Sequence, residues 1–230
     1  MVEGVPLPSR MGRLRLPTLC LITDRHQCGE TELEAVVEAA IEGGVNVVQL
    51  REKDLSAGEL FSLGMRLREV TRGKALLLIN DRVDVAQACG ADGVHLPENG
   101  LPTPIARWVM GRNALVGCSV HSVEAAAQAE RDGADLVQLG TIFVSPSKPD
   151  SPPAGPELLR EVADAVSVPV LAVGGVTPEN AAEVIAAGAG GAAVISAICG
   201  ADDPKAAAKS LVEAMAEAWS RREAGGKAKA

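Results

Sequence analysis

The sequence predicts an α/β fold, a single (β/α)₈ TIM barrel, from three observations. The chain has 230 residues, within the roughly 200–250 residues that one such barrel occupies. Hydrophobic residues make up 47% of the chain but aromatic residues only 2%, so Ala, Val, Leu and Ile must build the core, as they do in parallel sheets and their covering helices. Lastly, one pattern repeats along the chain: an Ala-rich helical stretch ends in Gly, and a short apolar strand follows.

The repeated pattern occurs four times, at an interval of roughly 45 residues that leaves room for two βα units in each repeat. Four repeats therefore make eight units. Eight units of even size close more naturally into a barrel than into an open, doubly wound sheet, which is the alternative arrangement. The repeats cover residues 38–52, 86–98, 127–140 and 181–196.

The remaining four strands lie between the repeats as apolar runs that end in polar residues or glycine. Helix starts are marked by residues that cap a first turn or by a proline at its first position. The barrel is predicted to span residues 17–220, with residues 1–16 as an N-terminal tail and 221–230 as a disordered C-terminal tail. The strand runs are 18–24, 75–81, 114–120 and 168–175, and the helix-start signals are Asp81, Ser122, Thr177-Pro178 and Asp203-Pro204.

The composition excludes several classes of partner. With a net charge of −8, the chain has no excess positive charge with which to bind a nucleic acid or an anionic membrane. It also has too few aromatic residues to stack on the bases of a single strand. No apolar run is long enough to span a membrane, and the basic start of the chain lacks the apolar region of a signal peptide. Five scattered cysteines without zinc or CxxC spacing favour reduced thiols. We therefore expect a cytoplasmic protein that binds a small molecule.

The active site is expected where the strands run into their following loops, because these loops share one end of a barrel. Two glycines and an Ile-Ser step after the last two strands are the sharpest signal there. Glycine lets backbone N–H groups approach an anion closely, so the set Gly174, Gly175, Ile195 and Ser196 predicts a phosphate site. The alternative is that the two glycines only make a tight turn between strand and helix.

A run of charged residues after the second strand is the next signal. Strand alternation would place Gln49, Arg51 and Lys53 on one side, so that an amide and two cations face the mouth of the barrel. Arg suits bidentate phosphate contacts, whereas Lys acts as a mobile point charge. The alternative is a solvated cluster of salt bridges with Glu52 and Asp54.

Polar residues also follow the third and sixth strands. Asn80 and Asp81 suit Mg²⁺, which prefers carboxylate oxygen together with substrate phosphate. Asp81 is also placed to cap the next helix, and its spacing favours that role. The long Pro/Ser loop at 145–156 has a length that often accompanies function. It contributes the candidate residues Ser145, Ser147 and Lys148.

Three histidines are candidates for proton transfer. His121 would face the mouth together with Ser119, two residues earlier on the same side of the strand. This position makes a catalytic role for His121 as well supported as a structural one. His95, at the end of the fourth strand, and His26, in the first loop, have weaker support.

Taken together, these residues resemble the thiamine-phosphate synthase/thiazole tautomerase family over about residues 17–215. Each motif is modest by itself, but their order and spacing are specific. The resemblance implies an enzyme of thiamine biosynthesis that acts on a thiazole phosphate. The carrying motifs are QLREKD (49–54), LINDRVDVA (78–86), GADGVHL (90–96), GCSVHS (117–122), LGTIFVSPSK (139–148), VGGVTPENA (173–181) and VISAI (194–198).

The resembled family has two activities on one scaffold. Its synthase joins a hydroxymethylpyrimidine diphosphate to a thiazole phosphate and releases pyrophosphate, which requires Mg²⁺ and several cations to stabilise the departing charge. By resemblance, Asp81 matches one Mg²⁺ ligand. Diphosphate contacts are matched by Gln49, Arg51, Lys53, Asn80 and Lys148, and thiazole-phosphate contacts by Ser145, Gly175, Ile195 and Ser196.

One departure from the synthase pattern favours the other activity. The synthase typically reads HLGQxD after the fourth strand, and its Asp is the second Mg²⁺ ligand. This chain has Gly100 there, with Glu98 and Asn99 beside the matching position. We therefore expect a tautomerase, which aromatises a carboxylated thiazole phosphate by moving a proton and needs no cofactor. His121 then resembles the catalytic residue, since an imidazole transfers protons near neutral pH. The intact cationic set favours the synthase, which stays the alternative with Mg²⁺ as its cofactor.

Two interpretations outside this family stay open. A phosphosugar isomerase or an aldolase-like barrel would use the same phosphate cup, but an aldolase needs a lysine within a strand. Lys53 and Lys148 both lie beyond strand ends. A non-catalytic sensor of thiamine precursors is compatible with the missing Asp, and the Ala-rich helices are compatible with a homodimer.

Overall fold

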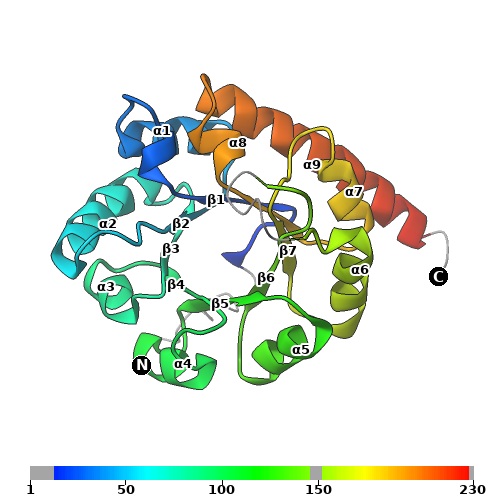
Figure 1. Ribbon diagram of the computed structural model, residues 1–230, viewed down its shortest axis with the longest axis horizontal. Helices are drawn as coiled ribbons and strands as arrows, with labels where there is room; N and C mark the ends of the chain where they lie inside the picture. Colours follow the sequence, from blue (N-terminus) through cyan, green and yellow to red (C-terminus); the bar gives the residue numbers. More distant parts are fainter. Residues whose placement is uncertain (1–12, 146–151, 228–230) are drawn as a thin grey trace, which may run out of the picture.

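Eight parallel strands form a closed barrel in the computed structural model, which describes residues 13–145 and 152–227 (Figure 1). Each strand pairs with the next one along the chain, and the last pairs with the first. The closure confirms the (β/α)₈ prediction and excludes the open sheet. The strands are β1 Thr18–Ile22, β2 Val47–Leu50, β3 Leu76–Asn80, β4 Gly93–Leu96, β5 Leu115–Val120, β6 Leu136–Gly140, β7 Val170–Val173 and β8 Gly191–Val194.

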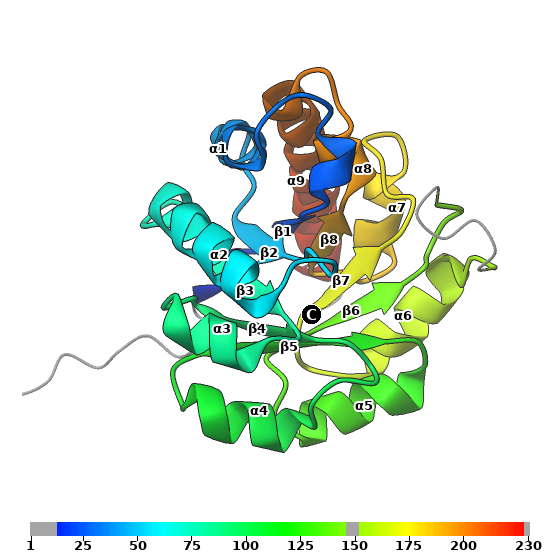
Figure 2. The ribbon, with the colours of Figure 1, turned by 60° about the vertical axis from the view of Figure 1, so that its left-hand side comes forward.

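Helices surround the barrel on its outer side, as the two views in Figures 1 and 2 show. One follows each strand, and β8 is followed by two, a short one and then the longest helix of the described chain. A 3-10 turn, η2 (Arg25–Gln27), lies between β1 and the first helix. The helices are α1 Leu33–Glu42, α2 Ala57–Thr71, α3 Val83–Ala88, α4 Thr103–Met110, α5 Val123–Arg131, α6 Gly155–Ala165, α7 Ala181–Ala186, α8 Ser196–Cys199 and α9 Pro204–Lys227.

The glycines of the repeated pattern end the helices. Gly44, Gly90, Gly133 and Gly188 each follow a helix with φ between +62° and +109°, the left-handed region that favours glycine at this position. The chain then turns directly into the next strand. A local signal in the sequence thus sets where each of these helices stops.

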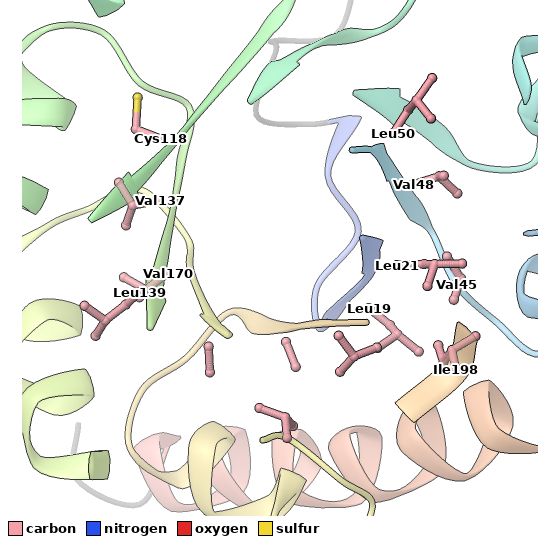
Figure 3. Packing of buried hydrophobic residues seen from close by; sticks show 14 of the residues in the cluster. Leu19, Leu21, Val45, Val48, Leu50, Cys118, Val137, Leu139, Val170 and Ile198 are labelled. Atoms are coloured by element: carbon pink, nitrogen blue, oxygen red, sulfur yellow. The ribbon is translucent and has the colours of Figure 1, made fainter. Parts of the chain in front are cut away.

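The hydrophobic core has two layers, because successive residues of each strand point to opposite faces of the sheet. The outer layer lies between strands and helices, and Figure 3 shows part of it, including Leu21, Val48 and Leu139. The inner layer fills the barrel and includes Leu78 and Leu171. Fully burying one such side chain contributes about 1.5–3 kcal/mol to the free energy of unfolding.

Both predicted tails differ from their expected boundaries. Leu14 is buried within the inner core, and Arg13 pairs with Asp92, so the chain is packed against the barrel before residue 17. Helix α9 continues past residue 220 to Lys227. Arg222 ties this part of α9 to the barrel, because it donates to the carbonyls of Ile185 in α7 and of Ala189 in the loop that follows.

All five cysteines are buried thiols without a disulfide partner, as their spacing predicts. No helix in the described part of the chain combines the length and the apolar character that crossing a bilayer would require.

Candidate functional site

Two cavities open where the strands end and their following loops begin. The first has a volume of about 300 Å³ and is lined by Arg51, Lys53, Asn80 and Asp81, among others; we call it the cationic cavity. The second has a volume of about 370 Å³ and its lining includes Ser119, His121, Ser145, Gly174, Gly175, Ile195 and Ser196; we call it the glycine cavity. Residues far apart in the sequence thus gather at the mouth of the barrel.

The β2–α2 segment places two cations in the cationic cavity. Thr23, just after β1, accepts the backbone N–H of Arg51 through its hydroxyl at 2.9 Å. Within the described chain, Arg51 and Lys53 take part in no ion pair, whereas Glu52 and Asp54 both pair with Arg25 from the preceding loop. The alternative of a rim cluster therefore applies to the acidic residues only, and the two cations face the cavity.

The end of β3 presents a carboxylate to the same cavity. Asp81 has a φ of +64°, a left-handed conformation that costs energy in any residue with a side chain. Its backbone N–H donates to the carbonyl of His95 at 2.8 Å, which holds the turn. The expected helix cap is not formed, because α3 begins after Arg82 and lacks a side-chain cap. The strained turn leaves the Asp81 side chain at the cavity lining instead.

The cationic cavity suits a magnesium ion that arrives with a diphosphate. Mg²⁺ usually binds one or two protein carboxylates and completes its coordination with substrate phosphate and water. Asp81 supplies one carboxylate beside two cations that suit phosphate oxygens. Among the described residues no cluster of three or more His, Cys, Asp or Glu is arranged to hold a metal, so the phosphates would provide the further ligands.

Two glycines, which have no side chains, form part of the lining of the glycine cavity. Gly174 and Gly175 have φ values of +94° and +66°. A Cβ atom at Gly175 would lie 2.4 Å from the carbonyl oxygen of Val144, closer than real Cβ contacts allow. Opposite them, α8 begins at Ser196, and the first N–H groups of a helix have no acceptor within the helix. Such free N–H groups in a glycine-lined cavity suit a phosphate.

Asn180 holds the glycine turn in place, a role that the sequence analysis missed. Its side-chain amide donates to the carbonyl of Gly175 at 2.8 Å, and its oxygen accepts the backbone N–H of Thr177 at 2.8 Å. The expected helix start at Thr177-Pro178 is instead a turn, and α7 begins at Ala181. An Asn three residues after a Thr, within TPEN, is the signal that could have indicated this bond.

Hydrogen bonds between three side-chain amides inside the barrel connect the two cavities. Gln138 lines the glycine cavity and donates to Gln49 at 2.7 Å; Gln49 in turn donates to Asn80 of the cationic cavity at 3.2 Å. Gln49 is therefore buried inside the barrel, with 2% of its surface exposed, and does not reach the mouth as Arg51 does. Gln49 thus supports Asn80 from inside the barrel, and its own contact with substrate stays a prediction.

His121 lies beside the glycine cavity and pairs with Glu98. Its Nδ1 atom is 2.8 Å from a carboxylate oxygen of Glu98, and both side chains are about half exposed. Ser119 lines the same cavity, as strand alternation predicts. The carboxylate of Glu98 is thereby engaged by an imidazole, which makes it a poor replacement for a missing metal ligand.

His95 is fully buried below the mouth and is held neutral. Its Nε2 atom is 2.9 Å from the hydroxyl of Ser119, while its Nδ1 atom has no hydrogen-bond partner among the described residues. Burial, together with the charge of Arg51, lowers the pKa of His95 to about 3. A proton on this ring would be a charge without solvent, so His95 orients Ser119 rather than transferring protons near neutral pH.

The depressed pKa of His95 predicts a loss of stability in acid. The unfolded chain takes up this proton near pH 6.5 and the folded chain only near pH 3, so stability present above pH 6.5 is lost as the pH falls between these values. The expected slope is about 1.4 kcal/mol per pH unit. Urea unfolding at pH 7, 6 and 5 should show this slope in the wild type and in the His26→Gln control, but not in His95→Asn. A slope that survives in His95→Asn would contradict the assignment.

The predicted loop residues are only partly described. Ser145 is buried and lines the glycine cavity. Ser147 and Lys148 lie outside the described residues, so their predicted contacts stay predictions.

Comparisons with known proteins place these residues in a family. The model of a family described as thiamine monophosphate synthase matches residues 19–198. A thiamine-phosphate synthase of Roseiflexus castenholzii is 46% identical, with 94% of each chain covered. One from Moorella thermoacetica is 46% identical over 86% of this chain and 95% of its own. A solved thiamine phosphate pyrophosphorylase from Pyrococcus furiosus is 38% identical with a TM-score of 0.81, covering 87% of this chain and 96% of that chain.

These relatives bear on the choice between the two expected activities. Their names describe the synthase, so the comparisons favour the synthase over the tautomerase that the sequence analysis preferred. That preference rested on Gly100 at the position of a second metal ligand. The names of the relatives agree instead with the intact cations of QLREK and the carboxylate of Asp81, which share one cavity.

Proposed function

The chain belongs to the thiamine monophosphate synthase family, and we propose that it is a thiamine-phosphate synthase, a transferase of thiamine biosynthesis. Its substrates would be hydroxymethylpyrimidine diphosphate and thiazole phosphate, and its second product pyrophosphate. The observation that carries this proposal is the pair of cavities at the mouth: one places Arg51 and Lys53, which have no ion-pair partner among the described residues, beside the carboxylate of Asp81, and the other is lined by glycine. A tautomerase acts on a single substrate with one phosphate, so it needs no second phosphate-binding cavity.

The cationic cavity would bind the diphosphate. Arg51 and Lys53 line this cavity and would meet the phosphate oxygens, and Asn80, whose side-chain oxygen accepts from Gln49, would donate a further hydrogen bond. Lys148 joins this set by resemblance only. Asp81 would hold Mg²⁺, which supplies positive charge to the leaving pyrophosphate. These residues stabilise charge that develops as the bond between the pyrimidine methylene carbon and the diphosphate oxygen breaks.

The glycine cavity would bind the thiazole phosphate. Backbone N–H groups near Gly175 and at the start of α8 suit its phosphate, and Ser145 and Ser196 offer hydroxyls. Holding both substrates at one mouth brings the thiazole nitrogen to the methylene carbon, which lowers the entropic cost of their encounter. The nitrogen attacks with its own lone pair, so the new carbon–nitrogen bond forms without removal of a proton.

The absence of a proton transfer makes His121 a decisive test. We expect the wild-type protein to release pyrophosphate only when both substrates and Mg²⁺ are present. The His121→Ala variant should retain most of this release, because no step of the synthase reaction needs a base. A coupled pyrophosphate assay measures both rates. No release by a wild-type protein that still binds thiazole phosphate would contradict the synthase, and turnover of the carboxylated thiazole lost in His121→Ala would support the tautomerase.

A further inference from the structure

Arg25, in the loop after β1, binds the two acidic residues that alternate with the cations of the cationic cavity. Its guanidinium donates to Glu52 at 2.9 Å and to one oxygen of Asp54 at 2.7 Å, and it also bonds the second oxygen of Asp54. The backbone N–H of Arg25 donates to both oxygens of Glu52, at 3.2 and 3.3 Å. His26 adds a contact of 3.2 Å to Asp54.

Residues 51–54 follow β2 and enter a turn, in which the backbone N–H of Leu55 donates to the carbonyl of Glu52 at 3.4 Å. Arg51 and Lys53 line the cationic cavity, while the side chains of Glu52 and Asp54 reach across to the β1–α1 loop. The segment is also fixed at its start, where Thr23 accepts the N–H of Arg51. The two carboxylates are therefore held by Arg25, while Arg51 and Lys53 line the cavity without an ion-pair partner among the described residues.

We propose that Arg25 is a positioning residue for diphosphate binding: it restrains Glu52 and Asp54 so that Arg51 and Lys53 stay directed into the cationic cavity. This inference rests on the proposed synthase function. Arg25 itself would not touch the substrate, since its fork of donors is already used by two carboxylates.

Charge provides a second reason for this role. The Glu52 side chain is 2% exposed and borders the cationic cavity, so its carboxylate must find a cation nearby. With Arg25 present, that cation is Arg25. Without it, Arg51 and Lys53, which line the same cavity as Glu52, would be available to the freed carboxylate, and pairing with them would neutralise the charge that the diphosphate needs.

The ionisation of the Asp54 carboxyl also supports its pairing with Arg25. The hydrogen bonds from Arg25 hold the pKa of Asp54 well below its usual range, so its carboxylate stays charged and bound at any pH at which the enzyme would work. The network joins the loops after the first and second strands, which the sequence separates by 27 residues or more.

The variants Arg25→Ala and Arg25→Lys test the inference, and Arg66→Ala is the matched control. Arg66 is a suitable control because it also pairs with a glutamate, Glu34, but lies on α2 away from both cavities. Binding of pyrophosphate with Mg²⁺ is measured by calorimetry, and KM is measured for each substrate. Arg25→Ala should weaken pyrophosphate binding and raise the KM for the pyrimidine diphosphate about 10–100-fold, while the KM for thiazole phosphate stays within about twofold. Arg25→Lys, which cannot hold both carboxylates with one fork, should fall between.

Stability is controlled with a double variant. If Arg25→Ala unfolds because Glu52 is left unpaired, Arg25→Ala combined with Glu52→Gln removes the buried charge and should regain the wild-type melting temperature. Its pyrophosphate binding should still be weaker than in the wild type, because Asp54 has also lost its partner Arg25. Wild-type binding of pyrophosphate by the folded Arg25→Ala variant would overturn the inference, as would an equal loss for both substrates. A wild-type protein that neither binds nor releases pyrophosphate would instead overturn the proposed function, and the inference with it.

Discussion

Arg51→Ala is expected to lower kcat for pyrophosphate release by about 10²–10³-fold, the cost of removing one group that stabilises developing charge. Arg51 is half-buried, lines the cationic cavity and has no ion-pair partner among the described residues, so its charge is free for the substrate. A guanidinium also suits bidentate contact with a diphosphate. Steady-state rates with both substrates and Mg²⁺ measure the loss.

Arg82→Ala provides a contrast within the same cavity. Arg82 also borders the cationic cavity, but its guanidinium is bound to both oxygens of Asp84, at 2.8 and 2.5 Å. Its charge is already balanced, so we expect a far smaller loss than for Arg51→Ala. Equal losses in the two variants would mean that net charge at the mouth, rather than the placement of Arg51, controls the reaction.

Gly175→Ala is expected to raise the KM for thiazole phosphate by about tenfold or more, because a small misplacement of binding groups is costly. The added Cβ would lie 2.4 Å from the Val144 oxygen and 2.8 Å from the Phe143 Cβ atom, so the turn must move. Movement would also break the bond from Asn180 to the Gly175 carbonyl. The KM for the pyrimidine diphosphate should change much less, because that substrate is assigned to the other cavity.

Gly90→Ala separates the effect of the clash from that of backbone strain. Gly90 has a φ of +62°, close to the +66° of Gly175, but a Cβ added there meets nothing within 4 Å. We expect Gly90→Ala to lose about 1–2 kcal/mol of stability, the cost of a left-handed residue with a side chain, and to keep the wild-type KM. A raised KM in Gly90→Ala would show that general destabilisation, and not the glycine cavity, explains the result for Gly175.

Much of the fold could be predicted because its signals are local. The helix, glycine and strand pattern reflects backbone preferences within a few residues, and the glycines after α1, α3, α5 and α7 adopt the left-handed conformation that the pattern requires. Alternation along a strand is equally local, and it correctly predicts that Ser119 and His121 line one cavity. Eight such units leave few arrangements other than a closed barrel.

Strand alternation predicts which face of the sheet a residue is on, but not how far inside the barrel its side chain lies. Gln49 is an example. The residue is on the same face as Arg51, yet it lies inside the barrel, where Gln138 approaches it from four strands away. The same limit applies to Asp81. Its spacing fits a helix cap, but a bond to the carbonyl of His95 on the neighbouring strand holds a strained turn that the sequence does not display.

The sequence by itself determined that this chain forms a (β/α)₈ barrel, it predicted a phosphate site at the mouth, and its motifs indicated the family. Only the tertiary structure decided that the mouth is divided into two cavities, that Arg25 rather than Arg51 or Lys53 neutralises Glu52 and Asp54, and that Asn180 holds the glycine turn. The physical reason is the range of the interactions. Helix ends and strand faces depend on neighbours in the chain, whereas ion pairs and cavity linings depend on residues that meet only after the barrel has closed.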